Sequence, residues 1–186
     1  DVTERSHAHG AGYTDRVGTG TGGGVARLMY FETVDVGYKA DLGSHIFTAE
    51  DIVGFAKRWD PQRFHLDAEA ARESMFGALC ASGWHTACMW MRLNVDDGKK
   101  RTEEAAAAGE PLPRFGPSPG IFDLKWPRPV YVGDTVSYSW TILDKRESKS
   151  RPEWGIVTYL AEAYNQDSKC VLSFHGRFFL GRLSAT

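Results

Sequence analysis

The sequence predicts an α+β fold in which an antiparallel sheet wraps around a central buried helix, and two observations lead to this prediction. Helical patterns occupy the first half of the chain, and the last of them, at residues 84–93, is apolar on nearly all sides, as is typical of a buried helix. Strands with alternating apolar and polar residues follow. Because an antiparallel sheet must cover its apolar face, we expect the 84–93 helix to cover it.

Length and composition indicate one globular unit. The 186 residues suffice for one domain with a hydrophobic core. Residues 1–27 are polar and Gly-rich, so we expect a flexible arm there and a single domain over residues 28–186.

Charge and cysteine content exclude several classes of protein. A net charge of −2 argues against a surface that binds nucleic acid or anionic membranes. No apolar run reaches the roughly 18 residues of a membrane helix. The three cysteines lack the spacing of a disulfide framework or a zinc site, so we expect a reducing, cytoplasmic location and no bound metal.

The first helical pattern begins after Thr48, which offers an N-cap with Asp51 three residues later. An apolar stripe follows, formed by Ile52, Phe55, Ala56 and Trp59. Pro61 ends this helix because proline disfavours helical geometry in the residue before it. Asp60 is therefore expected in a tight connection just after the helix.

Two further helices are predicted. One runs from an N-cap at Asp67 to Met75. The other opens at Ser82 and Gly83, and its stripe consists of Trp84, Ala87, Cys88 and Met91. Residues 94–119 are charged, then Ala-rich, then rich in Pro and Gly, so we expect a long surface excursion with room for one helical turn in the alanines.

The strands come mainly from the last third of the chain. Residues 31–37 are expected to form a short edge segment ending in a turn. Four strands are predicted at residues 121–125, 135–142, 155–164 and 170–180. The last three form an antiparallel meander, and a meander wrapped around a buried helix is the arrangement known as the hot-dog fold.

Asp60, His65 and Gly83 have the chemistry of a catalytic site. A carboxylate beside an imidazole can hold one water molecule and move its proton. A glycine at a helix N-terminus offers a backbone N–H without an intrahelical partner, together with the positive end of the helix dipole, and so can stabilise an oxyanion. Alone, Asp60 is explained as a turn residue and His65 as a structural histidine. Their joint occurrence with Gly83 favours catalysis.

The segment from Asp60 to Gly83 resembles the MaoC-like family, typified by the (R)-specific enoyl-CoA hydratases. The resemblance is carried in order by Asp60, His65, Asp67, the Phe76–Gly77 pair and Gly83, and further on by residues 129–134. Some positions differ from the family pattern. Pro61 directly follows the first aspartate, Gln62 and Arg63 take the next places, and Ser82 stands where histidine is common before the glycine.

The resemblance implies a hot-dog enzyme that hydrates a 2-enoyl-CoA to an (R)-3-hydroxyacyl-CoA, or catalyses the reverse dehydration. Asp60 and His65 would be its acid/base pair. Coenzyme A would be part of the substrate, with no other cofactor, and the protein would form a homodimer or a dimer of dimers. The expected substrate-binding residues are Ser82, Arg63, Gln62 and Arg128. Two alternatives remain: a hot-dog thioesterase, and a hot-dog protein that binds acyl thioesters without turning them over.

Overall fold

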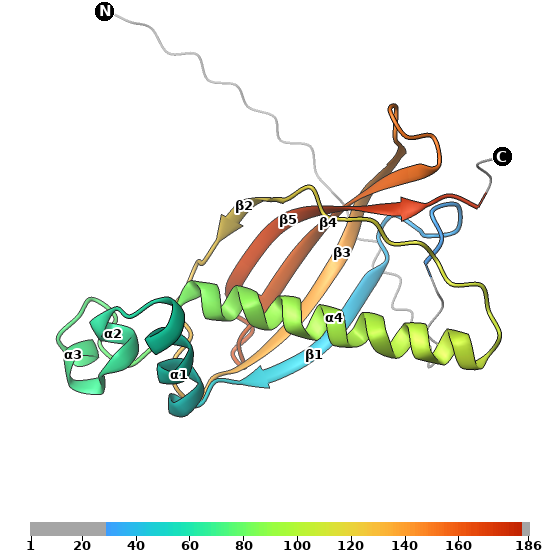
Figure 1. Ribbon diagram of the computed structural model, residues 1–186. Helices are drawn as coiled ribbons and strands as arrows, with labels where there is room; N and C mark the ends of the chain where they lie inside the picture. Colours follow the sequence, from blue (N-terminus) through green and yellow to red (C-terminus); the bar gives the residue numbers. More distant parts are fainter. Residues whose placement is uncertain (1–28, 184–186) are drawn as a thin grey trace, which may run out of the picture.

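The computed structural model describes residues 29–183, so the predicted arm at residues 1–27 lies outside the described residues. The described chain forms one five-stranded antiparallel sheet with the order β1-β3-β4-β5-β2, and a long helix, α4, runs along its concave side (Figure 1). The strands are β1 (Lys39–Ile46), β2 (Ile121–Lys125), β3 (Thr135–Glu147), β4 (Trp154–Tyr164) and β5 (Cys170–Gly181). The helices are α1 (Ala49–Trp59), α2 (Arg63–Leu66), α3 (Ala68–Arg72) and α4 (Gly83–Ala107). The predicted fold is confirmed.

The central part of the sheet is the predicted meander of β3, β4 and β5. Every second residue of β4 is buried, so this strand presents one apolar face to the core. The strands predicted at 121–125, 155–164 and 170–180 agree with the structure, whereas the strand predicted at 135–142 continues to Glu147. Between the sheet and α4 lies the hydrophobic core, whose largest fully buried side chains include Tyr138, Ile142 and Leu172.

Strand β1 was not predicted. It pairs with β3, and its register shifts between Asp41 and Gly43, a bulge in which Gly43 has a φ of 87°. The prediction of an edge segment at residues 31–37 was wrong, because these residues form consecutive turns. Phe31 and Val34 are nevertheless buried there, and the Lys145 ammonium donates to their carbonyl oxygens at 3.0 and 2.7 Å.

Helix α4 extends 14 residues beyond the predicted end at residue 93. The surface excursion predicted for residues 94–119 was therefore wrong for residues 94–107, which are helical. Three i,i+4 ion pairs stabilise this charged half: Arg92 with Asp96 and Arg101 with Asp97, both at 2.7 Å, and Lys100 with Glu104 at 3.9 Å.

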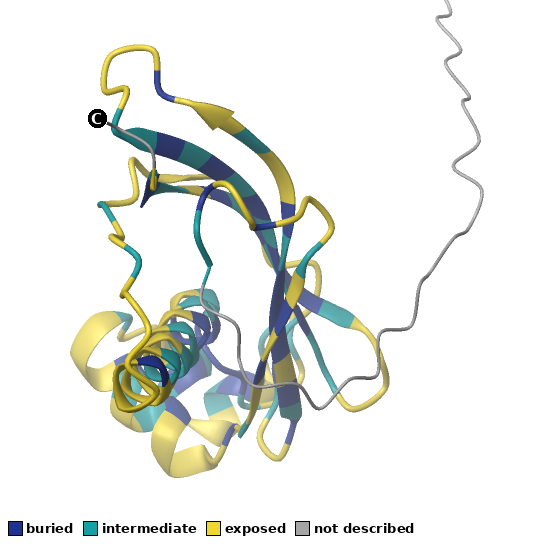
Figure 2. Cartoon of the chain, turned by 90° about the vertical axis from the view of Figure 1, so that its right-hand side faces the viewer, coloured by how far each residue is buried: buried dark blue, intermediate teal, exposed yellow. Residues whose placement is uncertain are grey.

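The predicted stripe of α4 was also wrong. Trp84, Cys88 and Met91 are exposed, and the helix instead buries Thr86 and Trp90 against the sheet. In Figure 2 the side of α4 that faces away from the sheet is largely exposed. The helix therefore packs on one side only within this chain.

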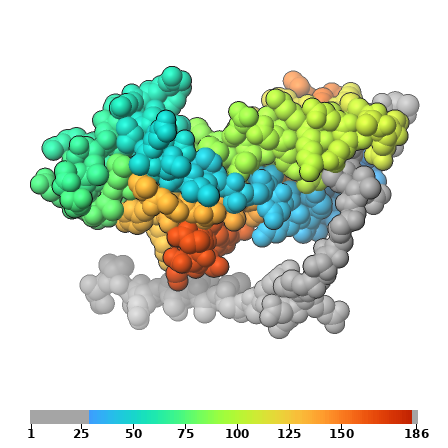
Figure 3. All heavy atoms as spheres, turned by 90° about the horizontal axis from the view of Figure 1, so that it is seen from below, coloured from blue at the N-terminus to red at the C-terminus, as the bar shows by residue number. Residues whose placement is uncertain are grey.

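The short helices α1–α3 gather at one end of the molecule, while α4 extends toward the other (Figure 3). The N-cap at Thr48 is confirmed, because its hydroxyl oxygen accepts from the Asp51 N–H at 3.1 Å. Trp59 was expected in the buried stripe of α1 but is exposed. The second predicted helix is shorter than expected: α3 ends at Arg72, before Met75. No helix of the described residues has the length and apolarity needed to cross a membrane.

Candidate active site

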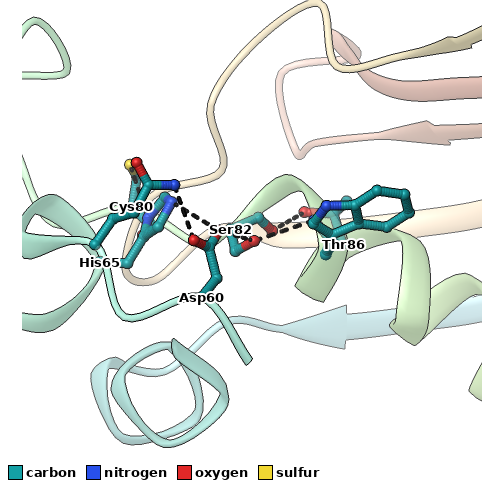
Figure 4. A network of polar contacts seen from close by, with 7 residues as sticks. Asp60, His65, Cys80, Ser82 and Thr86 are labelled. Atoms are coloured by element: carbon teal, nitrogen blue, oxygen red, sulfur yellow. Dashed lines mark hydrogen bonds and ion pairs between the residues drawn. The ribbon is translucent and has the colours of Figure 1, made fainter. Parts of the chain in front are cut away.

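Asp60 lies where α1 ends, and three side chains surround its carboxylate (Figure 4). One carboxylate oxygen, Oδ2, accepts a hydrogen bond from the Ser82 hydroxyl at 2.7 Å. The other, Oδ1, accepts from the Gln62 side-chain amide at 2.8 Å. The His65 ring nitrogen Nε2 lies 3.6 Å from Oδ2. The carboxylate is thus fixed from two sides and open toward the imidazole.

These contacts decide the charge of Asp60. Burial raises the pKa of its carboxyl group, but the hydrogen bonds from Ser82 and Gln62, together with the attraction of the His65 ring, lower it by more. The net pKa lies below the usual value of an aspartic acid. Asp60 is therefore a carboxylate at neutral pH, and a weak proton acceptor.

His65 lies in α2 and is only 5% exposed. Asp60 was expected in a tight connection after the helix, and within this connection the single turn of α2 brings the His65 side chain back toward the carboxylate. Nδ1 is 2.7 Å from the carbonyl oxygen of Cys80. Because a carbonyl only accepts, Nδ1 carries the proton of the neutral ring, and Nε2 faces Asp60 with a free lone pair. The gap of 3.6 Å is too long for a hydrogen bond, so the two groups face each other without a direct one, and a single water molecule could contact both.

The Cys80 thiol is the other group beside the imidazole, with its sulfur 3.8 Å from Nδ1 of His65. Burial raises the pKa of this thiol to about 11. Cys80 is therefore a protonated core residue, and its contribution to the site is its carbonyl oxygen. Cys88, expected in the apolar stripe of the 84–93 helix, is exposed.

Ser82 and Gly83 bring the start of α4 to the same place. The Ser82 hydroxyl oxygen accepts from the Trp84 N–H at 3.2 Å while the hydroxyl donates to Asp60, so one group caps the helix and orients the carboxylate. Within the described residues, the Gly83 N–H has no hydrogen-bond acceptor. A Cβ atom on Gly83 would lie 2.6 Å from the Trp126 ring, so only glycine permits this indole to pack over the helix start.

One cavity of about 500 Å³ contains these groups, and we refer to it as the Asp60 cavity. The predicted site residues that line it are Asp60, Gln62, His65, Ser82, Gly83 and Arg128. Arg63 is exposed on the first turn of α2 and is not among the lining residues. Phe76, which belongs to the segment that carries the family resemblance, also lines the cavity, whereas Trp126 and the Cys80 carbonyl were not predicted, because tertiary packing alone brings them to the site.

Arrangements of this kind suit addition of water to a polarised double bond. Asp60 and His65 can hold a water molecule between them. The Gly83 N–H at the N-terminus of α4 can donate a hydrogen bond to an oxygen atom that gains negative charge during the reaction. Arg128 adds a cation at the cavity, where its guanidinium donates to the Cys170 carbonyl at 3.3 Å.

Comparison with known proteins places this geometry in a family. Residues 33–165 match the MaoC like domain. The structure of a MaoC-like dehydratase from Rhodospirillum rubrum is similar at 36% identity with a TM-score of 0.68, over 83% of this chain and 97% of that one. The uncharacterized protein YdeM of Bacillus subtilis is 30% identical over 117 residues, which are 63% of this chain and 74% of that protein.

The fold is shared more widely. The R-hydratase PhaJ1 from Pseudomonas aeruginosa has a TM-score of 0.59 at 21% identity, over 82% of this chain and 86% of its own, a likeness of fold alone. The family match, by contrast, covers most of the described chain, including all of the residues that line the Asp60 cavity except Val171. The chain belongs to the MaoC-like domain family.

Proposed function

We propose that this protein is a hydratase/dehydratase that adds or removes water across the 2,3 double bond of an acyl thioester. One observation carries the proposal: the Asp60 carboxylate and Nε2 of His65 face each other across 3.6 Å, in the cavity that the free N–H of Gly83 also lines. Membership in the MaoC-like family supports it, as does the similar structure that bears the name of a MaoC-like dehydratase.

In the hydration direction, a water molecule lies between Asp60 and His65. Nε2 of His65 accepts a proton from this water, because the Asp60 carboxylate is the weaker base, while the carboxylate holds the water and stabilises the resulting imidazolium. The water oxygen bonds to C3, and the π electrons of the double bond move onto the thioester oxygen. Gly83 N–H and the dipole of α4 stabilise that oxyanion.

The imidazolium of His65 then returns its proton to C2 as the thioester carbonyl re-forms. The product is a 3-hydroxyacyl thioester, for which we propose the (R) configuration, and His65 is again neutral. Dehydration follows the same steps in reverse. Every proton taken from water is thus delivered to the product, and no redox partner is required.

We propose coenzyme A as the carrier of the acyl group. The chain has a net charge of −2, so the phosphates of coenzyme A need a local cation rather than a general field. Arg128 lines the Asp60 cavity and is exposed, which suits it to a phosphate contact. Arg63, on the exposed first turn of α2, is less well placed to reach the same ligand.

The test is the loss of absorbance of crotonyl-CoA on hydration, measured for the wild type, Asp60→Asn, His65→Ala and a matched control, Asp144→Asn. Asp144 lies exposed on β3. Removing a positioned acid/base group lowers kcat by about 10²–10⁴-fold, so the Asp60 and His65 variants should lose turnover while Asp144→Asn keeps it.

Parallel detection of free thiol separates the alternatives. Thiol release in place of hydration would identify a thioesterase. Binding of crotonyl-CoA without either reaction would identify a protein that only binds acyl thioesters. A wild-type kcat in Asp60→Asn would contradict the proposed role of the pair.

We also propose that two copies of the chain associate. Strand β2 is a five-residue edge strand, and most of its residues are exposed. Near it, Trp84 and Trp126 contact each other with ring centroids 5.2 Å apart, yet 54% and 40% of their surfaces are exposed. The unpaired edge of β2 and the exposed apolar rings beside the Asp60 cavity are features that a second copy of the chain would cover.

A further inference from the structure

The Asp60 cavity has an exposed end and a buried end. Arg128, Trp84 and Trp126 line the exposed end. Thr86 and Val171 line the buried end and are only 2% and 1% exposed. Coenzyme A is charged, and burying unpaired charge is costly, so the carrier leaves through the exposed end. The apolar acyl tail of a bound thioester therefore extends toward the buried end.

Two aromatic rings lie behind this buried end. Trp90 follows Thr86 by one turn of α4, and Phe174 follows Val171 by three residues on β5. The ring centroids of Trp90 and Phe174 are 4.9 Å apart at an interplanar angle of 79°, an edge-to-face contact. These side chains are 2% and 3% exposed. We refer to this pair of rings as the Trp90 wall.

Further contacts hold the wall in place. The indole N–H of Trp90 donates to the Ser139 carbonyl at 3.2 Å. The ring also stacks on Tyr159, with centroids 5.7 Å apart and an interplanar angle of 6°. Because protein interiors are close-packed, a buried ring held in this way does not move aside for a ligand.

Unused space lies beyond the wall. A second cavity of about 540 Å³, between α4 and the inner face of the sheet, is lined by residues that include Trp90, Trp140, Tyr159 and Phe178. The two cavities share no lining residue in the described chain. The molecule thus contains room for a long acyl tail, and the Trp90 wall separates this room from the reacting groups.

The distance to the wall limits the length of the tail. Gly83, whose N–H would bind the thioester oxygen, and Trp90 are seven positions apart in α4, which is roughly 10 Å along the helix axis. The ring keeps ligand carbons at a van der Waals distance of about 3.5–4.0 Å. With C–C bonds of about 1.5 Å, an extended acyl chain of about six carbons fills the remaining length.

We propose that Trp90 and Phe174 determine substrate specificity by setting the upper length of the acyl chain. The site then accepts short enoyl thioesters, up to about six carbons, and excludes longer ones. This inference rests on the hydratase/dehydratase function proposed above and names its class of substrate.

The first test compares kcat/KM for crotonyl-CoA and for the longer trans-2-decenoyl-CoA in the wild type. One surplus methylene in a closed hydrophobic pocket already costs about 10–200-fold, so we expect the value for decenoyl-CoA to be at least about 100-fold lower. Comparable values for the two substrates would overturn the proposal.

Opening the wall should reverse this preference. Trp90→Leu joins the Asp60 cavity to the second cavity, so the ratio of decenoyl-CoA to crotonyl-CoA turnover should rise at least about tenfold. If Trp90→Leu does not fold, Phe174→Leu makes the same test and keeps the indole hydrogen bond. Trp140→Leu is the matched control, because it enlarges the second cavity without opening the wall. An unchanged ratio in a folded wall variant, or an equal rise in Trp140→Leu, would overturn the proposal.

Binding of saturated ligands separates this inference from the proposed function. Butyryl-CoA and decanoyl-CoA have no double bond to hydrate, and their affinities are measured by calorimetry. We expect the wild type to bind decanoyl-CoA at least about tenfold more weakly, and this difference to shrink in Trp90→Leu. This result without hydration of crotonyl-CoA would overturn the proposed function and support the length limit. Equal affinities in the wild type would overturn the length limit, whether or not crotonyl-CoA is hydrated.

Discussion

At the scale of single residues, the hydroxyl of Ser82 connects the two halves of the candidate site. It donates to the Asp60 carboxylate at 2.7 Å and accepts from the first turn of α4 at 3.2 Å. The family pattern commonly has histidine at this position, and a histidine has no hydroxyl group that could both donate to Asp60 and cap the helix. The acidity of Asp60 in this chain therefore depends on Ser82.

Ser82→Ala should change the pH dependence of turnover. The hydrogen bond from Ser82 lowers the pKa of Asp60, so its removal raises that pKa, and the limb that Asp60 contributes to the kcat/KM profile, on the acid side of the limb set by the His65 base, should move to higher pH. We expect kcat to fall about tenfold at neutral pH, because the carboxylate is also less well oriented.

Ser82→Thr, which keeps a hydroxyl, should restore the limb, and Ser44→Ala on the exposed side of β1 should leave the profile unchanged. An unshifted limb in Ser82→Ala would show that Ser82 only caps the helix.

Gly83→Ala should lower activity because of Trp126. The added Cβ atom would lie 2.6 Å from the indole, so the ring must leave its place above the start of α4. We expect kcat/KM to fall about tenfold while the helix content by circular dichroism stays the same.

Gly54→Ala in α1 is the matched control, since a Cβ atom there meets nothing within 4 Å. It should raise the free energy of unfolding by about 0.5–1 kcal/mol and leave kcat/KM unchanged. If Gly83→Ala has the same activity as Gly54→Ala, the glycine is not needed for this packing.

At the scale of secondary-structure elements, one imidazole joins α4 to α1 and to the end of β1. The His85 ring stacks on Phe55 at 4.5 Å and meets the edge of Phe47 at 4.9 Å. Burial, and to a smaller extent His45, lower the pKa of His85 against the opposing effect of Asp51, and the net pKa is about 4. The folded protein therefore holds this ring neutral, as suits a residue whose role is to pack between elements.

This junction predicts weaker folding in acid. Between pH 6.5 and 4 the unfolded chain binds a proton at residue 85 and the folded chain does not, so the free energy of unfolding falls as the pH falls. The loss is roughly 3 kcal/mol once pH 4 is reached. Denaturant unfolding at several pH values should show it, and His85→Phe should flatten the dependence. The low pKa of Asp60 acts only at still lower pH, outside this window.

Elements could be predicted from the sequence where one periodicity dominates. Strand β4 alternates without interruption and was found almost to the residue. Strand β1 was not, because a bulge at Gly43 breaks its alternation and only Ala40 and Leu42 are buried. The second half of α4 was missed because ion pairs rather than an apolar stripe stabilise it.

The candidate site likewise contains residues that the sequence pattern predicts and residues that it does not. Asp60, His65, Ser82 and Gly83 were predicted, since their chemistry depends on spacing along one short segment. Trp126 was not, because its position over Gly83 results from packing between segments that are far apart in the sequence.

At the scale of the whole molecule, we predict a dimer. Light scattering at micromolar concentration should give about 41 kDa, twice the chain mass of 20.7 kDa. Ile121→Asp, on the exposed edge strand β2, should shift the population toward the monomer because like charges would meet across a symmetric edge. Asp144→Asn, on the same sheet but away from that edge, is the control. A wild-type mass of about 21 kDa would contradict the dimer.

The short segment that holds Asp60 and His65 also has an evolutionary consequence. Gln62, Cys80 and Ser82 fix this pair, and all of them precede or begin α4, so no side chain of the sheet takes part. Sheet residues such as Val171 only shape the wall of the cavity. Mutations in the sheet can therefore accumulate and alter the shape of the accepted ligand while the reacting groups keep their geometry. Because different segments hold the reacting groups and shape the cavity, the range of substrates can diverge between descendants faster than the reaction catalysed.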